Sequence, residues 1–210
     1  MRIIGGQAAG RIVRVPEGLG VRPMPDKVKL AVFNSLGGFV DGVRVLDLFA
    51  GTGALGHECL SRGARSVVSV EKSDKHARFY RHNLELTGLP AAAVELRVTD
   101  VFSALPQLEA AGRRFELVIA DPPYGEKNVG RRSQSLAQKL LDDPHLPPLL
   151  EPGGLFILGH TKRDTLELGV FWKERKQLRH GDTVIRFLEA APTSGLGAPP
   201  AVSIPAESGV

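Results

Sequence analysis

The sequence predicts an α/β fold: a Rossmann-like, seven-stranded, mostly parallel sheet with helices on both faces and a C-terminal antiparallel hairpin. Three observations predict it. Several segments from Val43 onward are apolar at nearly every position, as strands buried on both faces are. The stretches between them carry apolar residues at helical spacing. Two final strand-like segments flank Gly181-Asp182, which is typical of a hairpin turn.

The elements follow in chain order, beginning with a small N-terminal extension. RIIGGQ and RIVRVP, in residues 2–16, are expected to form two short strands joined through glycines, and DKVKLAVFNSL has the apolar spacing of a helix. The strands of the sheet are expected at VRVLDLF, SVVSVE, VELRVTD, ELVIAD and LFILGH and near residues 173–180 and 183–189. The intervening helices are expected near residues 54–62, 74–87, 101–111 and 131–142.

This pattern divides the chain into three parts. Residues 1–42 form the hairpin-and-helix extension, and residues 43–190 form the main domain. Residues 191–210, PTSGLGAPPAVSIPAESGV and the alanine before it, are rich in Pro, Gly and Ser and are expected to be a disordered tail.

Composition limits the class of protein. With 42% hydrophobic residues, no apolar run as long as a membrane span and no signal-peptide core in MRIIGGQAAGR, we expect a cytoplasmic protein without membrane contact. The single cysteine, Cys59, excludes an internal disulfide framework, and the histidines lack metal-ligand spacing, so no metal site is expected. Residues 1–44 hold seven basic and three acidic side chains, which is the whole net charge of +4. A polyanion that meets the N-terminal segment would explain this imbalance, and so would a solvated surface that happens to be basic.

Acidic residues end four successive predicted strands: Asp47, Glu71, Asp100 and Asp121. In an open parallel sheet the ligand lies beyond the carboxyl ends of the strands, close to the point where strand order reverses. A surface loop needs an acid at none of these places. The four carboxylates therefore predict a ligand site at that edge.

The loop after the first strand is glycine-rich and fits two cofactors. Gly51, Gly53 and Gly56 satisfy G-x-G-x-x-G, and Glu71 follows at the distance of a ribose-binding acid, as in nicotinamide-dependent oxidoreductases. Asp47, however, would repel the pyrophosphate of a dinucleotide at this loop. The same carboxylate suits S-adenosylmethionine, which carries an ammonium group and no phosphate. Asp47 would then face the methionyl amine, Glu71 the ribose hydroxyls and Asp100 the adenine amino group.

The fourth strand ends in Asp121-Pro122-Pro123-Tyr124, which is stiffer than a turn requires. The prolines hold Asp121 extended, so that its carboxylate and the carbonyl of Pro122 can accept both protons of an exocyclic amine. These bonds would localise the nitrogen lone pair for in-line methyl transfer, a step helped mainly by positioning and electrostatics. Tyr124 offers a ring on which the extruded base can stack.

DLFAGTG followed by DPPY resembles the amino-methylating class I S-adenosylmethionine-dependent methyltransferases. More narrowly, RIIGGQAAGR, RP, FNSL, LDLFAGTGALGHECLSRGA, VVSVEKS, DPPYG and HGDTVIRF resemble the bacterial 16S ribosomal RNA (guanine-N2) methyltransferase family over about residues 1–189. The resemblance implies methylation of a guanine in 16S rRNA or the small ribosomal subunit by a monomer. It also implies Asp47–Gly53 as cofactor loop, Glu71 as ribose acid and Asp121–Tyr124 as catalytic tetrad.

The candidate site residues fall into three groups. The catalytic candidates are Asp121, Pro122, Pro123 and Tyr124. The cofactor-binding candidates are Asp47, Phe49, Ala50, Gly51, Thr52, Gly53, Glu71, Lys72, Asp100 and Val101. The RNA-binding candidates are Arg2, Arg11, Arg14, Arg22, Lys27, Lys29, Arg131 and Arg132.

The chain departs from the family pattern at two places. Met24-Pro25 follow the RP motif where the family usually has Thr and a helix with Arg and Glu, and a lysine such as Lys27 cannot reproduce the bidentate fork of an arginine. Gly159-His160 stand where the family often has a glutamate, and His160 is expected to be a surface or loop histidine. A DNA adenine-N6 methyltransferase remains an alternative, because it can use the same DPPY chemistry, although it normally needs an added target-recognition region.

Overall fold

The computed structural model describes residues 1–16, 24–123 and 132–191. Within these ranges the strands are β1 (Arg44–Leu48), β2 (Ser66–Val70), β3 (Val94–Arg97), β4 (Phe115–Ala120), β5 (Leu150–Thr161), β6 (Trp172–His180) and β7 (Thr183–Ala190). The α-helices are α1 (Asp26–Leu36), α2 (Ala54–Ser61), α3 (Asp74–Thr87), α4 (Val101–Ala110) and α5 (Leu136–Asp142). Short 3-10 segments lie at η1 (Gly37–Val40), η2 (Ala91–Ala93) and η3 (Pro147–Leu149).

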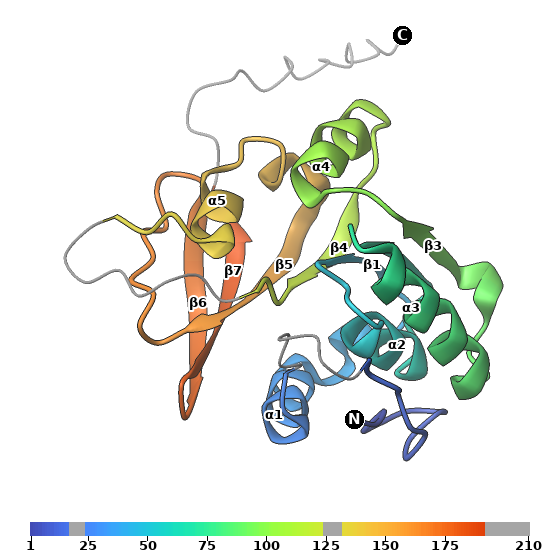
Figure 1. The fold of residues 1–210 in the computed structure, drawn as a ribbon. Helices are drawn as coiled ribbons and strands as arrows, with labels where there is room; N and C mark the ends of the chain where they lie inside the picture. Colours follow the sequence, from blue (N-terminus) through green and yellow to red (C-terminus); the bar gives the residue numbers. More distant parts are fainter. Residues whose placement is uncertain (17–23, 124–131, 192–210) are drawn as a thin grey trace, which may run out of the picture.

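All seven strands belong to one sheet, in the order β3-β2-β1-β4-β5-β7-β6. β1 to β5 run parallel, whereas β7 lies antiparallel between β5 and β6 (Figure 1). The strand order reverses between β1 and β4, so the carboxyl ends of these two strands border the crevice where such sheets bind ligands. The predicted fold class is confirmed.

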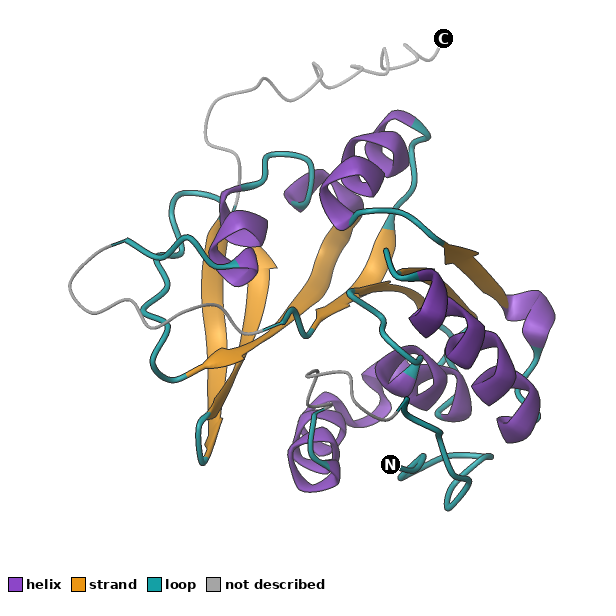
Figure 2. Ribbon diagram, in the orientation of Figure 1, coloured by secondary structure: helices purple, strands orange, loops and turns teal. Residues whose placement is uncertain are grey.

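Helices cover both faces of the sheet (Figure 2), because successive side chains of each strand point to opposite faces. Val45 of β1 packs into an apolar cluster with α1, α2 and the N-terminal residues. Leu46 and Leu48 of the same strand pack into a second cluster with α4 and α5. This double burial explains why the strands are apolar at nearly every position.

Capping side chains fix where three of the helices begin. Ser73 accepts a hydrogen bond from the backbone N–H of His76 at the start of α3, and Asp100 accepts one from Phe102 at the start of α4. Ser135 caps α5 in the same way. α5 therefore begins at Leu136, and the expectation of a helix over residues 131–142 is wrong for described residues 132–135.

The N-terminal extension forms a single antiparallel bridge, between Arg2 and Ile12, instead of the two strands expected in residues 2–16. Backbone bonds flank this bridge, such as the one from the N–H of Ile3 to the carbonyl of Arg11 at 2.9 Å, and other backbone groups of the extension bond to the main domain. The N–H groups of Ile4 and Gly5 donate to the Glu58 carboxylate of α2, at 2.8 and 2.9 Å. The extension consequently lies along α2 and α3, as the blue N-terminal segment in Figure 1 shows.

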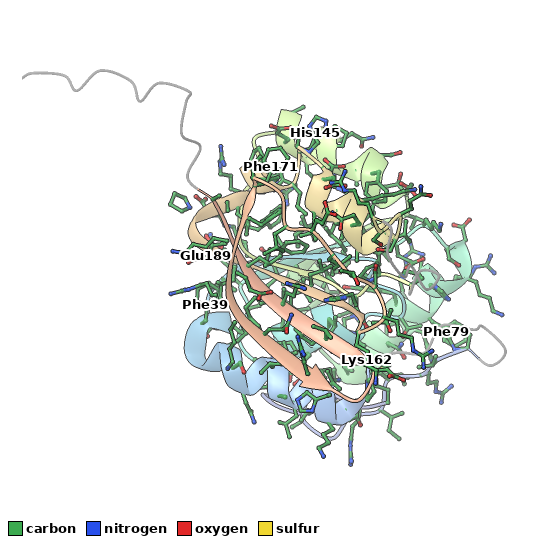
Figure 3. All side chains as sticks on the ribbon, turned by 90° about the vertical axis from the view of Figure 1, so that its left-hand side faces the viewer. Phe39, Phe79, His145, Lys162, Phe171 and Glu189 are labelled. Carbon is green, nitrogen blue, oxygen red and sulfur yellow. The ribbon has the colours of Figure 1, made fainter. Side chains whose placement is uncertain are left out.

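β6 forms one edge of the sheet, and Figure 3 shows the molecule from this side. Lys162 and Glu189, labelled there, lie toward opposite ends of the β6–β7 hairpin. The register between the two strands shifts between Glu174 and Lys176. Exposed basic side chains line β6 at Lys173, Arg175, Lys176 and Arg179. None of the helices in the described ranges has the length and apolar character that crossing a bilayer requires.

Candidate active site

Three of the predicted carboxylates meet at the carboxyl ends of β1, β2 and β4. Asp47 is level with Ser69 and Ile119 in the neighbouring strands, so Glu71 and Asp121 lie just beyond the same edge. The negative charges of Glu71 and Asp121 both act to raise the pKa of Asp47. The three groups therefore share one electrostatic environment.

Asp47 is a buried and incompletely satisfied carboxylate. Its Oδ2 accepts a hydrogen bond from the backbone N–H of Gly56 at 3.0 Å, whereas Oδ1 is buried and has no hydrogen-bond partner among the described residues. Burial raises the pKa of Asp47 to about 7, against the lowering effect of the Gly56 bond. The ionised form thus lacks a positive partner, and a cation beside Oδ1 would stabilise it.

The glycine loop after β1 is held in an unusual backbone conformation. Phe49 has φ of 58°, in the left-handed region that residues other than glycine seldom occupy. Gly53 has φ of 91°, and a Cβ atom there would lie 2.5 Å from the His57 ring. Strain of this kind concentrates at ligand-binding loops. Gly51 is fixed to the next strand end, since its N–H donates to Oε2 of Glu71 at 2.9 Å.

Glu71 organises the second strand end. Besides the Gly51 bond, its Oε1 accepts from the N–H of Ser73 at 2.8 Å and lies 3.3 Å from Nδ1 of His76. A carboxylate offers about four acceptor positions, so capacity for ligand hydroxyls remains. The Phe49 ring packs edge-on against Phe102, with centroids 6.3 Å apart.

The other cofactor candidates border this loop with different exposure. Ala50, Thr52 and Val101 are buried, whereas Lys72 and Asp100 are exposed. Asp100 caps α4, with Oδ1 accepting from the N–H of Phe102 at 2.9 Å. That bond leaves its other oxygen available to a ligand. Binding of a cofactor by these residues stays a prediction.

Asp121 presents a second unpartnered carboxylate oxygen. Its Oδ1 is buried with no hydrogen bond from the part of the chain that the structure describes, and burial raises the pKa of the group to about 7. A Cβ atom on Gly159 of β5 would lie 2.5 Å from this oxygen. Because Gly159 has no side chain, the Asp121 carboxylate has room at this position. Tyr124, the last residue of the predicted tetrad, lies outside the described residues.

A small hollow adjoins Asp121 on the α5 side. Its lining consists of Pro122, Pro123, Ser135, Ala137, Gly159, His160 and Asp164. His160 is buried rather than at the surface, so the expectation of a surface or loop histidine is wrong. Arg186 can only donate, so its Nε donates to Nε2 of His160 at 3.1 Å, and Nδ1 carries the proton toward the carbonyl of Thr161. Burial, followed by the charge of Arg186, lowers the pKa of His160.

The sequence-based prediction is wrong for one RNA-binding candidate, Lys29. Lys29 is fully buried, where its Nζ lies 3.2 Å from the Glu58 carboxylate and donates to the carbonyl of Arg2 at 2.6 Å. A lysine closed off from solvent cannot contact RNA, and the expectation for Lys29 is wrong.

The other basic candidates are distributed around the extension and α5. Arg2, Arg11, Arg14 and Lys27 are exposed. Arg132 is also exposed, but it is paired with Asp142 at 2.8 Å and Glu167 at 3.3 Å. Arg22 and Arg131 lie outside the described residues.

Sequence reasoning missed two buried polar residues that hold the extension in place. Glu58 of α2 binds Lys29, Arg62 and two backbone N–H groups of the extension. Asn83 of α3 is fully buried and bonds to both Arg14 and Thr52. Asn83 lies among the positions of α3 that face the core. A polar residue at such a position indicates a buried hydrogen-bonding role, and this was the signal in the sequence.

Residues 1–189 match the family described as "Conserved hypothetical protein 95". The chain belongs to this family. The match covers the extension, strands β1 to β6 and all of β7 except its last residue, Ala190. The resemblance identified from the sequence is thereby confirmed at the level of the family.

Several proteins that are similar to this chain carry names of rRNA methyltransferases. YlbH of Bacillus subtilis (strain 168), assigned as an rRNA methyltransferase, is 38% identical over 77% of this chain and 83% of its own length. Ribosomal RNA small subunit methyltransferase D of Escherichia coli (strain K12) is 36% identical over 59% of this chain and 60% of its own length. A solved T. thermophilus 16S rRNA N2 methyltransferase, RsmC, in complex with AdoMet and guanosine, is 27% identical with a TM-score of 0.65, covering 83% of this chain and 45% of that one.

Proposed function

We propose that this protein transfers a methyl group from S-adenosylmethionine to the N2 amine of a guanine in 16S rRNA, acting as a cytoplasmic monomer on the RNA or the small ribosomal subunit. The observation that carries the proposal is the pair of buried, unpartnered carboxylate oxygens of Asp47 and Asp121 at one sheet edge. The names of the B. subtilis and E. coli relatives support ribosomal RNA as substrate. The T. thermophilus complex supports guanine N2.

The residues present fit S-adenosylmethionine better than a dinucleotide. Two carboxylates without positive partners favour a ligand that carries an ammonium and a sulfonium, and they disfavour a pyrophosphate. In this arrangement Asp47 faces the methionyl ammonium, Glu71 accepts the ribose hydroxyls and Asp100 the adenine amino group. A nicotinamide-dependent oxidoreductase is therefore the weaker candidate, even though the loop satisfies G-x-G-x-x-G.

The residues of the chain need only to position the target amine and stabilise developing charge. S-adenosylmethionine supplies an electrophilic methyl group on its sulfonium. Asp121 and the carbonyl of Pro122 accept the two N–H groups of the target amine, which localises the nitrogen lone pair and directs it for in-line attack. The contribution of these residues is positioning and electrostatic stabilisation. The proton leaves readily once the nitrogen is methylated, so no strong base is required.

The decisive experiment is methyl transfer from tritiated S-adenosylmethionine to small ribosomal subunits from a strain that lacks the endogenous enzyme, followed by nucleoside analysis. Label in N2-methylguanosine is the expected result. Label in another base would keep the reaction type and overturn the choice of guanine. Transfer only to duplex DNA would favour the adenine-N6 alternative, which uses the same Asp121-Pro122-Pro123 geometry.

A further inference from the structure

A single buried side chain joins the N-terminal extension to the glycine loop. Oδ1 of Asn83 accepts the backbone N–H of Arg14 at 2.8 Å, and Nδ2 donates to the carbonyl of Arg14 at 2.9 Å. The same Nδ2 donates to the carbonyl of Thr52 at 2.9 Å. Both donors and the acceptor of this fully buried amide are therefore engaged.

We propose that Asn83 is a positioning residue through which RNA held by the extension and cofactor held by the glycine loop strengthen each other's binding. The inference rests on the proposed function, because it takes the extension as the RNA-facing part and the loop as the cofactor site. It adds a coupling between the two sites that neither the glycine motif nor the DPPY motif requires.

The geometry makes Asn83 difficult to replace. Its two donors point to carbonyl groups of segments 38 residues apart in the sequence, from Arg14 to Thr52. An aspartate would place an oxygen against both carbonyls and lose both donated bonds. An alanine would leave the buried Thr52 carbonyl and the part-buried N–H and carbonyl of Arg14 without this partner, which is unfavourable.

Each end of this connection is a functional segment. The side chain of Arg14 is exposed, so an RNA phosphate that binds it also restrains the backbone that Asn83 holds. Thr52 lies between Gly51, whose N–H donates to Glu71, and Gly53, whose φ of 91° sets the turn into α2. Restraining the Thr52 carbonyl thus favours the loop conformation that the cofactor needs. Linkage requires that RNA and cofactor raise each other's affinity by the same factor.

Calorimetric titration with S-adenosylhomocysteine tests the loop side without any RNA. We compare the wild type with Asn83→Ala, Asn83→Asp and the matched control Ser61→Ala. Ser61 anchors the same extension, since its Oγ accepts from the N–H of Ala8 at 2.9 Å and donates to the carbonyl of Gly5 at 2.5 Å. Both Asn83 variants are expected to bind about tenfold more weakly, because the buried hydrogen bond to the Thr52 carbonyl is lost, and the control within about twofold.

Hydrogen exchange on the wild-type protein tests the coupling even where the Asn83 variants do not fold. S-adenosylhomocysteine is expected to slow exchange at the glycine loop and also at residues 11–15. Equal affinities of the Asn83 and Ser61 variants, or protection confined to the loop, would overturn the inference and leave the proposed function intact. A wild type that binds no S-adenosylhomocysteine would overturn both.

Discussion

Asp47→Asn provides the sharpest test of the site's electrostatics. The substitution keeps the shape of the side chain and the acceptor for the Gly56 N–H, and it removes the charge whose Oδ1 has no partner. Burial raises the pKa of Asp47 from 3.8 to about 7. Below pH 3.8 the group is neutral in both folded and unfolded chains. Between pH 3.8 and about 7 only the folded chain holds the proton, so rising pH lowers the stability of the wild type.

The size of the effect follows from the shift. About 3 pH units at about 1.4 kcal/mol each give about 4 kcal/mol as the upper bound of the penalty above pH 7. At pH 5 roughly one third of it is present, so up to about 3 kcal/mol of the penalty develops between pH 5 and pH 8.5. The new amide N–H groups need acceptors and offset about 1–3 kcal/mol of the gain. The variant is expected to be more stable than the wild type at pH 8.5, by about 1–3 kcal/mol, and to lose that advantage at pH 5.

Urea denaturation of the ligand-free protein at the two pH values measures this difference. Asp74→Asn is the control, because it removes the same charge from an exposed position in the first turn of α3. S-adenosylhomocysteine should reverse the order, since the variant lacks the carboxylate that faces the ligand's ammonium. Identical pH dependence for the Asp47→Asn variant and the wild type would refute the buried, uncompensated charge.

Four further outcomes are expected. Asp121→Ala abolishes transfer with little change in S-adenosylhomocysteine affinity. The wild-type single-turnover rate falls as the pH drops below about 7, because burial raises the pKa of Asp121 and the protonated carboxyl accepts its amine proton more weakly than the carboxylate does; a flat pH–rate profile would contradict this. Gly159→Ala lowers kcat by about 10²-fold at unchanged cofactor affinity, since its Cβ displaces the Asp121 carboxylate; kinetics equal to the wild type would exclude that contact. Glu71→Ala weakens cofactor binding chiefly, as calorimetry can show or refute. Combined Arg11→Ala and Arg14→Ala raises the apparent KM for RNA and reduces the slope of log affinity against log salt by about 1.5, and an unchanged slope would move the RNA contact elsewhere.

The sheet and its ligand edge were predictable because they depend on local patterns. Apolar runs marked most of the parallel strands, and the acids at positions 47, 71 and 121 lie at or just beyond strand ends that a parallel sheet must bring together. Chain order alone therefore placed these three residues near one another. The loop conformation at Phe49, a residue with positive φ, carried no such signal.

Buried polar partners were not predictable, because they join segments far apart in the sequence. Lys29 and Glu58 belong to different helices, and both are residue types that usually lie at the surface. They are buried here because they pair with each other and the extension covers them. The strand that holds His160 is longer than predicted, because β5 begins at Leu150. The hydrogen-bond partner of His160 is Arg186, which belongs to β7. The contacts of the extension were missed for the same reason: residues 1–3 and 10–13 bond to each other through the backbone, but other backbone groups bond to side chains on α2 and α3.

Within the described ranges β6 is an edge strand of the sheet, and this has a consequence for how copies of the chain behave in solution. A strand edge presents unpaired backbone groups that can recruit another strand and start aggregation. Here that edge carries Lys173, Arg175, Lys176 and Arg179, and the register shift next to Glu174 breaks its regularity. If the β6 strands of two copies paired, like charges would face each other across an irregular ladder of backbone hydrogen bonds. These four basic side chains therefore oppose the addition of further strands to the sheet. They do so whether or not any nucleic acid is present.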